Sequence, residues 1–355
     1  MFRFFLQKLG YSLLTLWGVV TVIFLLFHWL PGDPARMLLD QNENSEQLQL
    51  VKKKYGFDQP LGTQYLWYLN DLSPISFHAN HAEHYTYFNQ SKYQGVSINF
   101  SSFTLAFKKP YLRESFQKNI SVSSILGNTL PNTFVLATLA MGFAVTFGLL
   151  FGMFAALQQN SWMDRNLVFF STIGMSLPSF FSAILFAWIF GFVLHAYTGL
   201  PIMGSLYEID DYGENSSIAW KNIVLPALVL GIRPLGVITQ LTRNSVLETL
   251  QQDYIRTAKA KGLNTFQIMR NHVLKNSLNP VVTAVSGWFA SLLAGAVFVE
   301  YIFGWNGLGK EIVSALNTLD LPVIMGSVLT ISLIFILINI VVDFIYAYLD
   351  PRLRN

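Results

Sequence analysis

The chain has 355 residues, of which 52% are hydrophobic and 12% are charged, and its formal net charge is +3. Because an average soluble domain carries about 25% charged residues, this composition indicates an integral membrane protein rather than a soluble one. The chain contains no cysteine, which excludes disulfides and thiol chemistry.

Continuous apolar runs predict the membrane-spanning helices. A helix needs about 20 apolar residues to cross a bilayer, and five runs without Asp, Glu, Lys or Arg satisfy this: 10–30, 130–157, 167–194, 278–299 and 322–342. We predict a sixth span over 223–242, although Arg233, Pro226 and Pro234 interrupt it. Since the runs do not alternate, an outer-membrane barrel is excluded.

The first run is expected to remain in the mature protein, because it is too long for a signal peptide and no small-x-small cleavage site follows it. With both termini in the cytoplasm, most Lys and Arg of the short segments lie inside, as the positive-inside rule requires. The resulting prediction is a multi-pass protein with the loop 253–280 on the cytoplasmic side.

Residues 31–121 are predicted to form a small external cap of mixed structure. The polar pattern of 45–72 predicts one or two amphipathic helices broken at Gly56 and Pro60. Between residues 96 and 100, apolar and polar side chains alternate, which is typical of a short strand.

The polar loop 253–280 carries the densest positive charge of the chain. Asp253 is predicted to cap a short helix that ends at Gly262 in the left-handed conformation. Asn264 is predicted to cap a second helix, with Gln267 completing a capping box.

One stripe of the first loop helix has little side-chain bulk, because Tyr254, Ala258 and Gly262 recur every four residues. A partner's surface could approach this stripe, with the charges of Arg256 and Lys261 at its rim. The alternative from composition is a basic loop that lies on anionic lipid.

Seven ordered motifs resemble those of permeases of ABC importers, in the dipeptide and oligopeptide branch. They are LPGDPA at 30–35, KKYGFDQPL at 53–61, SLPSF at 176–180, LPALVLG at 225–231, QQDYIRTAKAKGL at 251–263, VFVEYIFGWNGLGK at 297–310 and AYLDPRLR at 347–354. The segment at 251–263 resembles the EAA loop of this family. Arg256 and Thr257 stand where that motif has its first Glu and Ala, whereas Ala258 and Gly262 fit.

The resemblance implies an all-α membrane protein with six transmembrane helices in the type I importer permease fold, residing in the bacterial inner membrane. It implies a second permease, two ATPases that hold ATP and Mg²⁺, and an external solute-binding protein as partners, besides membrane lipid and without nucleic acid. No cofactor is expected on this chain, which is not itself an enzyme. Peptides are the implied substrate, with nickel chelates, glutathione or another small solute as alternatives.

In that family the EAA loop couples ATP hydrolysis to transport. The residues to which this role would transfer are Asp253, Tyr254, Arg256, Thr257, Ala258, Lys259, Ala260, Lys261, Gly262 and Leu263.

The predicted organisation follows from the spans and the resemblance together. The first transmembrane helix lies within 1–30 and the external cap within 31–121, where the resemblance lapses over an insertion at about 73–118. A five-helix permease core occupies 122–350 and contains the coupling loop 243–277, and residues 351–355 form a cytoplasmic tail.

Several other residues invite a functional interpretation. Arg233 could meet a peptide's carboxylate in the pathway, although a buried structural pair or a shorter helix is our preferred interpretation, since a charge at membrane depth costs about 3 kcal/mol. Gly304 to Lys310 spell GxxxxGK, but Glu311 replaces the Ser or Thr of a phosphate-binding loop. Glu300 is interpreted as a charge at the membrane interface.

Three histidines at intervals of three, His78, His81 and His84, could lie on one side of a helix and bind zinc or nickel. The same spacing in a polar external loop is typical of solvated side chains, so no metal site is predicted. A stand-alone secondary transporter is the competing function, but its paired broken helices and intramembrane ionisable groups are not evident.

Overall fold

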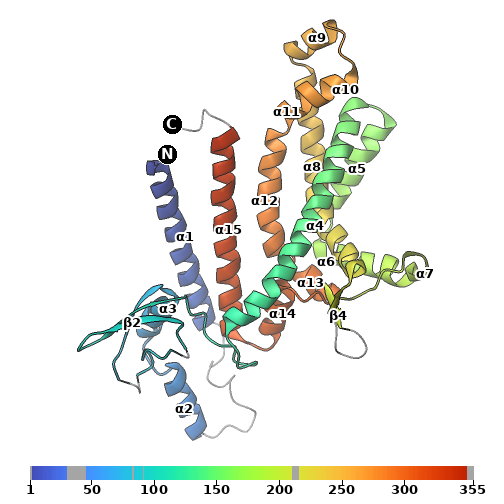
Figure 1. The fold of residues 1–355 in the computed structure, drawn as a ribbon. Helices are drawn as coiled ribbons and strands as arrows, with labels where there is room; N and C mark the ends of the chain where they lie inside the picture. The colour runs from blue at the N-terminus through green and yellow to red at the C-terminus, as the bar shows by residue number, and fades with distance from the viewer. Residues whose placement is uncertain (1, 30–44, 82–83, 91, 210–215, 350–355) are drawn as a thin grey trace. The chain divides into compact units, whose positions relative to one another are not determined.

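The computed structural model describes residues 2–29, 45–81, 84–90, 92–209 and 216–349, and helices dominate it (Figure 1). The described residues do not include the motif at 30–35 or the tail at 351–355. Of the motif at 347–354, they include residues 347–349. The chain divides into two compact units. The larger unit comprises Met1–Lys8, Thr129–Val313 and Leu333–Asn355, and the smaller unit comprises Leu9–Asn128 and Ser314–Ser332.

The larger unit is built around the long helix α8 (Trp220–Leu250), on which α5, α6, α12 and α13 pack directly. Its elements outside the polar loop, several of which continue into the smaller unit, are α4 (Val122–Leu157), α5 (Trp162–Ser176), α6 (Ser179–Phe186), the π-helix η2 (Ala187–Val193), α7 (His195–Thr198), β4 (Tyr207–Ile209), β5 (Ser216–Ile218), α12 (Asn279–Gly295), α13 (Val297–Phe303), α14 (Leu308–Asn317) and α15 (Leu321–Leu349).

Glycines allow α4 to approach α8 closely. A Cβ atom on Gly148 would lie 2.7 Å from the side chain of Ile238, and one on Gly152 would lie 2.6 Å from the carbonyl oxygen of Thr239. Small residues of this kind let membrane helices bring their backbones together. Ordinary helix packing therefore explains Gly148 and Gly152 in the second predicted span.

The predicted span 167–194 is not one helix, which corrects the sequence interpretation. It consists of α5 followed by α6 and η2, and the two halves meet at an angle of 107°. Pro178 has no backbone N–H to continue the helix, and it forces Leu177 into an extended conformation with φ −74° and ψ 134°. Pro178 was therefore the signal for the turn, although the apolar run continues across it.

In the described part of the chain, four helices are long and apolar enough to cross a membrane: Gln7–Trp29, Val122–Leu157, Trp220–Leu250 and Leu321–Val342. The count rises to six if each of two bent pairs forms one span. The second pair, Thr265–Ser277 with Asn279–Ala294, bends by 55°. The α8 helix extends well beyond the predicted span 223–242, in spite of its two internal prolines.

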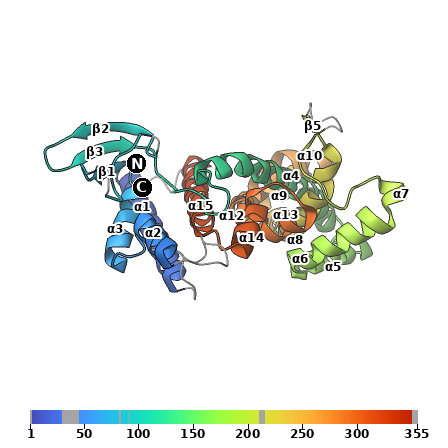
Figure 2. The ribbon, with the colours of Figure 1, turned by 90° about the horizontal axis from the view of Figure 1, so that it is seen from below.

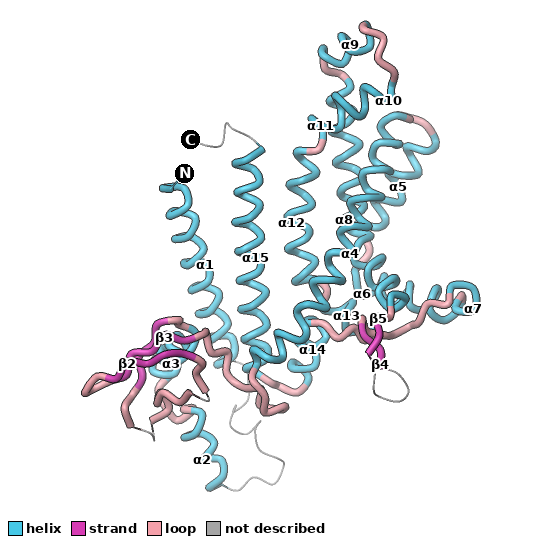
Figure 3. Tube along the Cα trace, viewed as in Figure 1, coloured by secondary structure: helices cyan, strands magenta, loops and turns pink. Residues whose placement is uncertain are grey.

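The smaller unit combines helices with a sheet. Its elements are α1 (Phe2–Trp29, which begins in the larger unit), α2 (Ser45–Tyr55), α3 (Leu61–Leu72), β1 (Ile75–His78), β2 (Gly95–Asn99) and β3 (Thr104–Lys108). The strands pair antiparallel with β3 in the middle (Figure 2). The predicted break between two helices near Gly56 and Pro60 is confirmed. The strand predicted between residues 96 and 100 corresponds to β2, which Figure 3 shows in this sheet.

A buried carboxylate organises the smaller unit. Asp71, at the end of α3, is 1% exposed and accepts hydrogen bonds from Tyr93 Oη at 2.9 Å and from Arg113 Nε at 3.1 Å. Lys108 Nζ donates to its backbone carbonyl, and burial lowers the pKa of Lys108 to about 8. Helix α3 and the segment around Arg113 are therefore held together by one paired charge.

Replacing Asp71 by Ala is expected to destabilise the smaller unit by about 3 kcal/mol, because it leaves the Arg113 guanidinium and the Tyr93 hydroxyl without their acceptor. The measurement is resistance of the purified protein to limited proteolysis within residues 45–128. The control is Asp58→Ala, which removes an exposed carboxylate. Equal resistance of the two variants would contradict the assigned role.

Candidate functional site

The polar loop forms a small helical subdomain at one end of α8 (Figure 1). It contains α9 (Asp253–Ala260), α10 (Thr265–Ile268), the π-helix η3 (Met269–Val273) and α11 (Leu274–Ser277). Gly262 lies between α9 and α10 with φ +83°, the left-handed conformation predicted for it. The loop is a folded element rather than an irregular connection.

The caps of the loop helices were predicted in part. Asn264 Oδ1 accepts from the N–H of Gln267 at 2.9 Å, and Gln267 Oε1 accepts from the N–H of Asn264 at 3.1 Å, so the predicted capping box is confirmed. Asp253 is the first residue of α9 rather than its N-cap, which is Gln252. Its carboxylate instead lies 3.4 Å from the guanidinium of Arg256 in an exposed pair.

One face of the loop packs on the chain itself. Ile255 and Ala258 of α9 join Ile268, Met269 and Val273 in a buried cluster that includes Ala156 of α4 and Val246 of α8. Ala258 is only 5% exposed, so it does not belong to a free surface of small residues. The predicted stripe is therefore divided, since Ala258 is turned inward while Tyr254 and Gly262 are exposed.

The outer face of the loop, meaning the part not buried in this cluster, carries exposed cations and two exposed aromatic rings. Arg256, Lys259 and Lys261 are exposed, as are Thr257 and Ala260, whereas Leu263 is half-buried. Tyr254 is 42% exposed and its hydroxyl accepts from Asn276 Nδ2 at 2.9 Å. Phe266 is 71% exposed. The sequence interpretation missed Phe266, although a phenylalanine in the first turn of a helix in a polar loop was the available signal.

An ion pair fixes the base of this loop. Arg243 of α8 contacts Asp164 of α5 through two bonds, Nε to Oδ1 at 2.6 Å and Nη2 to Oδ2 at 2.8 Å. Asp164 is 3% exposed, and its N–H donates to the N-cap side chain of Ser161. A two-bond guanidinium–carboxylate pair restrains orientation as well as distance, so the loop emerges from a rigid support.

Arg233 lies in a continuous helix, which corrects the preferred interpretation of a shorter helix or a buried pair. It is exposed on α8, and its guanidinium lies 6.0 Å from the ring centroid of Trp288 on α12. Among the described residues it has no ion pair with an Asp or Glu.

Glu300 is fully buried rather than interfacial, which is a second correction. Its Oε2 atom accepts the N–H groups of Gly309 at 2.6 Å and Lys310 at 3.3 Å, in the first turn of α14. A Cβ atom on Gly307 or Gly309 would collide with this carboxylate. Burial raises the pKa of Glu300 to about 7, against the opposite effect of the N–H groups. The sequence 304–310 is thus a turn that encloses a carboxylate and not a phosphate-binding loop.

The same turn is fastened to α4. Trp305 Nε1 donates to the carbonyl oxygen of Asn132 at 3.1 Å, and the N–H of Leu308 donates to Thr133 Oγ1 at 2.8 Å. Asn132 Nδ2 returns a bond to the carbonyl oxygen of Asn306 at 2.7 Å. Hydrogen bonds therefore fix the segment between α13 and α14 to α4.

The three histidines do not share a helix face. His78 ends strand β1 and is 2% exposed, and its ring nitrogens contact Ser76 Oγ and the carbonyl oxygen of Thr86, both at 2.8 Å. His84 Nδ1 contacts Thr86 Oγ1 at 2.8 Å. Within the described part of the chain, no three His, Cys, Asp or Glu side chains converge as metal ligands would.

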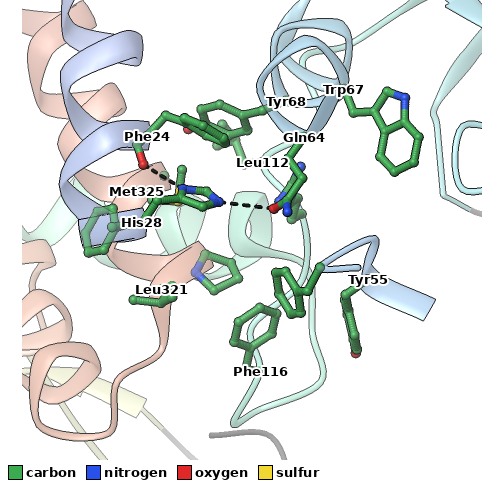
Figure 4. A pocket seen from close by; sticks show the side chains of 15 residues that line it. Phe24, His28, Tyr55, Gln64, Trp67, Tyr68, Leu112, Phe116, Leu321 and Met325 are labelled. Atoms are coloured by element: carbon green, nitrogen blue, oxygen red, sulfur yellow. Dashed lines mark hydrogen bonds between the residues drawn. The ribbon is translucent and has the colours of Figure 1, made fainter. Parts of the chain in front are cut away.

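An aromatic cavity lies within the smaller unit (Figure 4). His28 spans part of it, with Nδ1 2.8 Å from the carbonyl oxygen of Phe24 and Nε2 3.1 Å from Gln64 Oε1. The cavity volume is about 40 Å³. Since one water needs at least about 10 Å³, it can hold a few waters but not a peptide.

Two family models match the chain. The model described as binding-protein-dependent transport system inner membrane component matches residues 148–355. The model for the N-terminal part of the membrane components of these systems matches residues 1–81.

Characterised relatives align with the whole chain. The dipeptide transport system permease protein DppB of Alkalihalophilus pseudofirmus is 31% identical, with 100% of both chains covered. The di/tripeptide transport system permease protein DppB of Pseudomonas aeruginosa is 32% identical over 100% of this chain and 99% of its own. The glutathione transport system permease protein GsiC of Salmonella typhimurium is 33% identical with the same coverage.

The fold resembles a solved transporter. An inward-facing structure of the MetNI methionine ABC transporter contains a chain that matches with a TM-score of 0.50 and 17% identity. The match covers 64% of this chain and 97% of the other, which shows a common fold.

Replacing Glu300 by Gln is expected to flatten the dependence of thermal stability on pH. The folded-state pKa of about 7 lies above the ordinary value of 4.5, so this group stabilises the fold below about pH 4.5, and the contribution is lost as the pH rises through 7. The loss is roughly 3 kcal/mol.

The measurement is the melting temperature of the purified protein between about pH 4.5 and pH 8. Glu248→Gln, which neutralises an exposed carboxylate, is the control. An unchanged pH profile in Glu300→Gln would refute the role of this group.

Proposed function

This chain belongs to the family of inner membrane components of binding-protein-dependent transport systems, within its peptide permeases, and we propose that it carries di- or oligopeptides inward through a pathway shared with a second permease. An external solute-binding protein delivers the peptide, and two separate ATPase subunits bind ATP and Mg²⁺. The likeness to peptide permeases over the full chain supports this assignment.

The single observation that supports the coupling mechanism is that the polar loop has one buried face and one exposed face. Its inner face is buried against α4 and α8, while its outer face exposes Tyr254 and Phe266 among cations. Aromatic residues and Arg are enriched at protein interfaces relative to the rest of a protein surface. We assign the outer face to an ATPase, whose closure on ATP moves the loop together with α8.

Topology and the external cap complete the proposal. Six crossings result when each bent pair contributes one span, the second pair crossing along Asn279–Ala294. Cytoplasmic termini then place the basic loop inside, as the positive-inside rule favours. Residues 31–121 then form the external cap, where the insertion at about 73–118 is available to the binding protein.

Short peptides are the proposed substrate class. The dipeptide, di/tripeptide and glutathione permeases resemble this chain equally well, with 31% to 33% identity. Glutathione is itself a modified tripeptide, so one chemical class includes all three substrates. A nickel chelate or another small solute is the alternative, and a stand-alone secondary transporter is the least supported.

Replacing Phe266 by Ala is expected to uncouple the transporter while leaving the chain folded. The side chain is 71% exposed, so the monomer loses little packing, whereas an interface loses an anchor worth about 2 kcal/mol, or more than tenfold in affinity. ATP-dependent peptide uptake and copurification of the ATPase should both fall.

The matched control is Phe298→Ala, which removes an aromatic ring that is 58% exposed on α13, at the far end of the larger unit (Figure 1). Both variants are reconstituted in liposomes with the partner subunits. If Phe266→Ala retains the uptake and the ATPase content of the control, the outer face of the loop is not the coupling surface.

A further inference from the structure

Among the described residues, Arg233 has no counter-ion, although it lies near the middle of the long apolar helix α8. It lies 13 residues after the start of α8 at Trp220, or about 20 Å along the helix axis. The preceding turn is packed away, since Leu230 is 4% exposed, yet Arg233 itself is exposed. No carboxylate or carbonyl oxygen of a described residue accepts a hydrogen bond from its guanidinium. A charge so placed needs water or an anion beside it.

The neighbouring helix α12 does not expose the large apolar side chains of a lipid-facing surface. Within the described residues 279–294 of α12, no large hydrophobic side chain is exposed. The exposed positions are Asn279, Pro280, Thr283, Gly287, Ser291 and Ala294. By contrast, α4 exposes Phe134, Phe147 and Phe154, as a helix in contact with lipid should.

The surface of α12 is open at the residue before the ring that accompanies Arg233. A Cβ atom on Gly287 would have no atom within 4 Å, and Gly287 directly precedes the half-buried Trp288. The indole ring lies 6.0 Å from the Arg233 guanidinium, a distance at which the ring attracts the cation and restrains it. The guanidinium thus faces an indole ring on one side, and among the described residues it has no hydrogen-bond acceptor.

We infer that Arg233, restrained by Trp288, binds the C-terminal carboxylate of a substrate peptide as it crosses the membrane. A guanidinium binds a carboxylate through two parallel bonds, and every unmodified peptide brings this group. The inference rests on the proposed function. It assigns a residue of this chain, and not only the external binding protein, to recognition of the peptide end.

The test compares one tripeptide with its C-terminally amidated form. The complete transporter with its binding protein is reconstituted in liposomes, and ATP-dependent uptake is measured for both peptides with Arg233→Gln, Arg233→Lys and the wild type. In Arg233→Gln, uptake of the free peptide should fall about tenfold or more, because a charge-assisted pair is lost. Uptake of the amide should stay the same, and Arg233→Lys should retain part of the preference.

The control is Lys221→Gln, which removes an exposed cation from the first turn of the same helix and should leave the preference unchanged. The affinity of the binding protein for each peptide is measured separately, so that its own selectivity can be divided out. A preference that is equal in Arg233→Gln and wild type would overturn the inference, as would an equal loss for both peptides.

Loss of the second permease from the purified Arg233→Gln complex would also overturn it, since Arg233 would then pair with an acidic residue of that subunit. A wild-type complex that transports neither peptide with ATP contradicts the proposed function itself, which separates the two failures.

Discussion

The close approach of α4 to α8 is the contact on which the functional parts of the larger unit depend. Gly148 and Gly152 present no side chain to Ile238 and Thr239, so the two backbones approach closely at these residues. Helix α8 carries Arg233 at its middle, Arg243 near one end and the polar loop beyond. In the coupling role proposed for the loop, a movement of the loop would therefore reach α8 as a movement of a packed body.

Local structure could be predicted from the sequence, because its causes lie within a few residues. The capping box at Asn264, the left-handed Gly262 and the break near Pro60 each depend on one side chain or one backbone preference. The apolar runs predicted membrane helices for the same reason, since solvation by lipid acts on each residue separately.

Features that depend on distant partners were not readable. Glu300 is separated from Gly309 by a turn that only the finished fold closes, so a buried carboxylate was mistaken for an interfacial one. Ala258 fits a family motif and a stripe, yet its burial depends on Ala156 and Val246. His78 has the spacing of a metal ligand, but strand pairing encloses it instead. In each case the sequence pattern is present, but the residues packed around it in the fold decide its role.

The buried inner face of the polar loop has a consequence for association. Ordering one residue costs about 1–2 kcal/mol in backbone entropy, and a segment that folds only on contact spends that amount from its binding energy. Here Ile255, Ile268 and Val273 already form a core within the chain. In the coupling role proposed for it, the loop would meet the ATPase already folded, and no binding energy would be needed to order it.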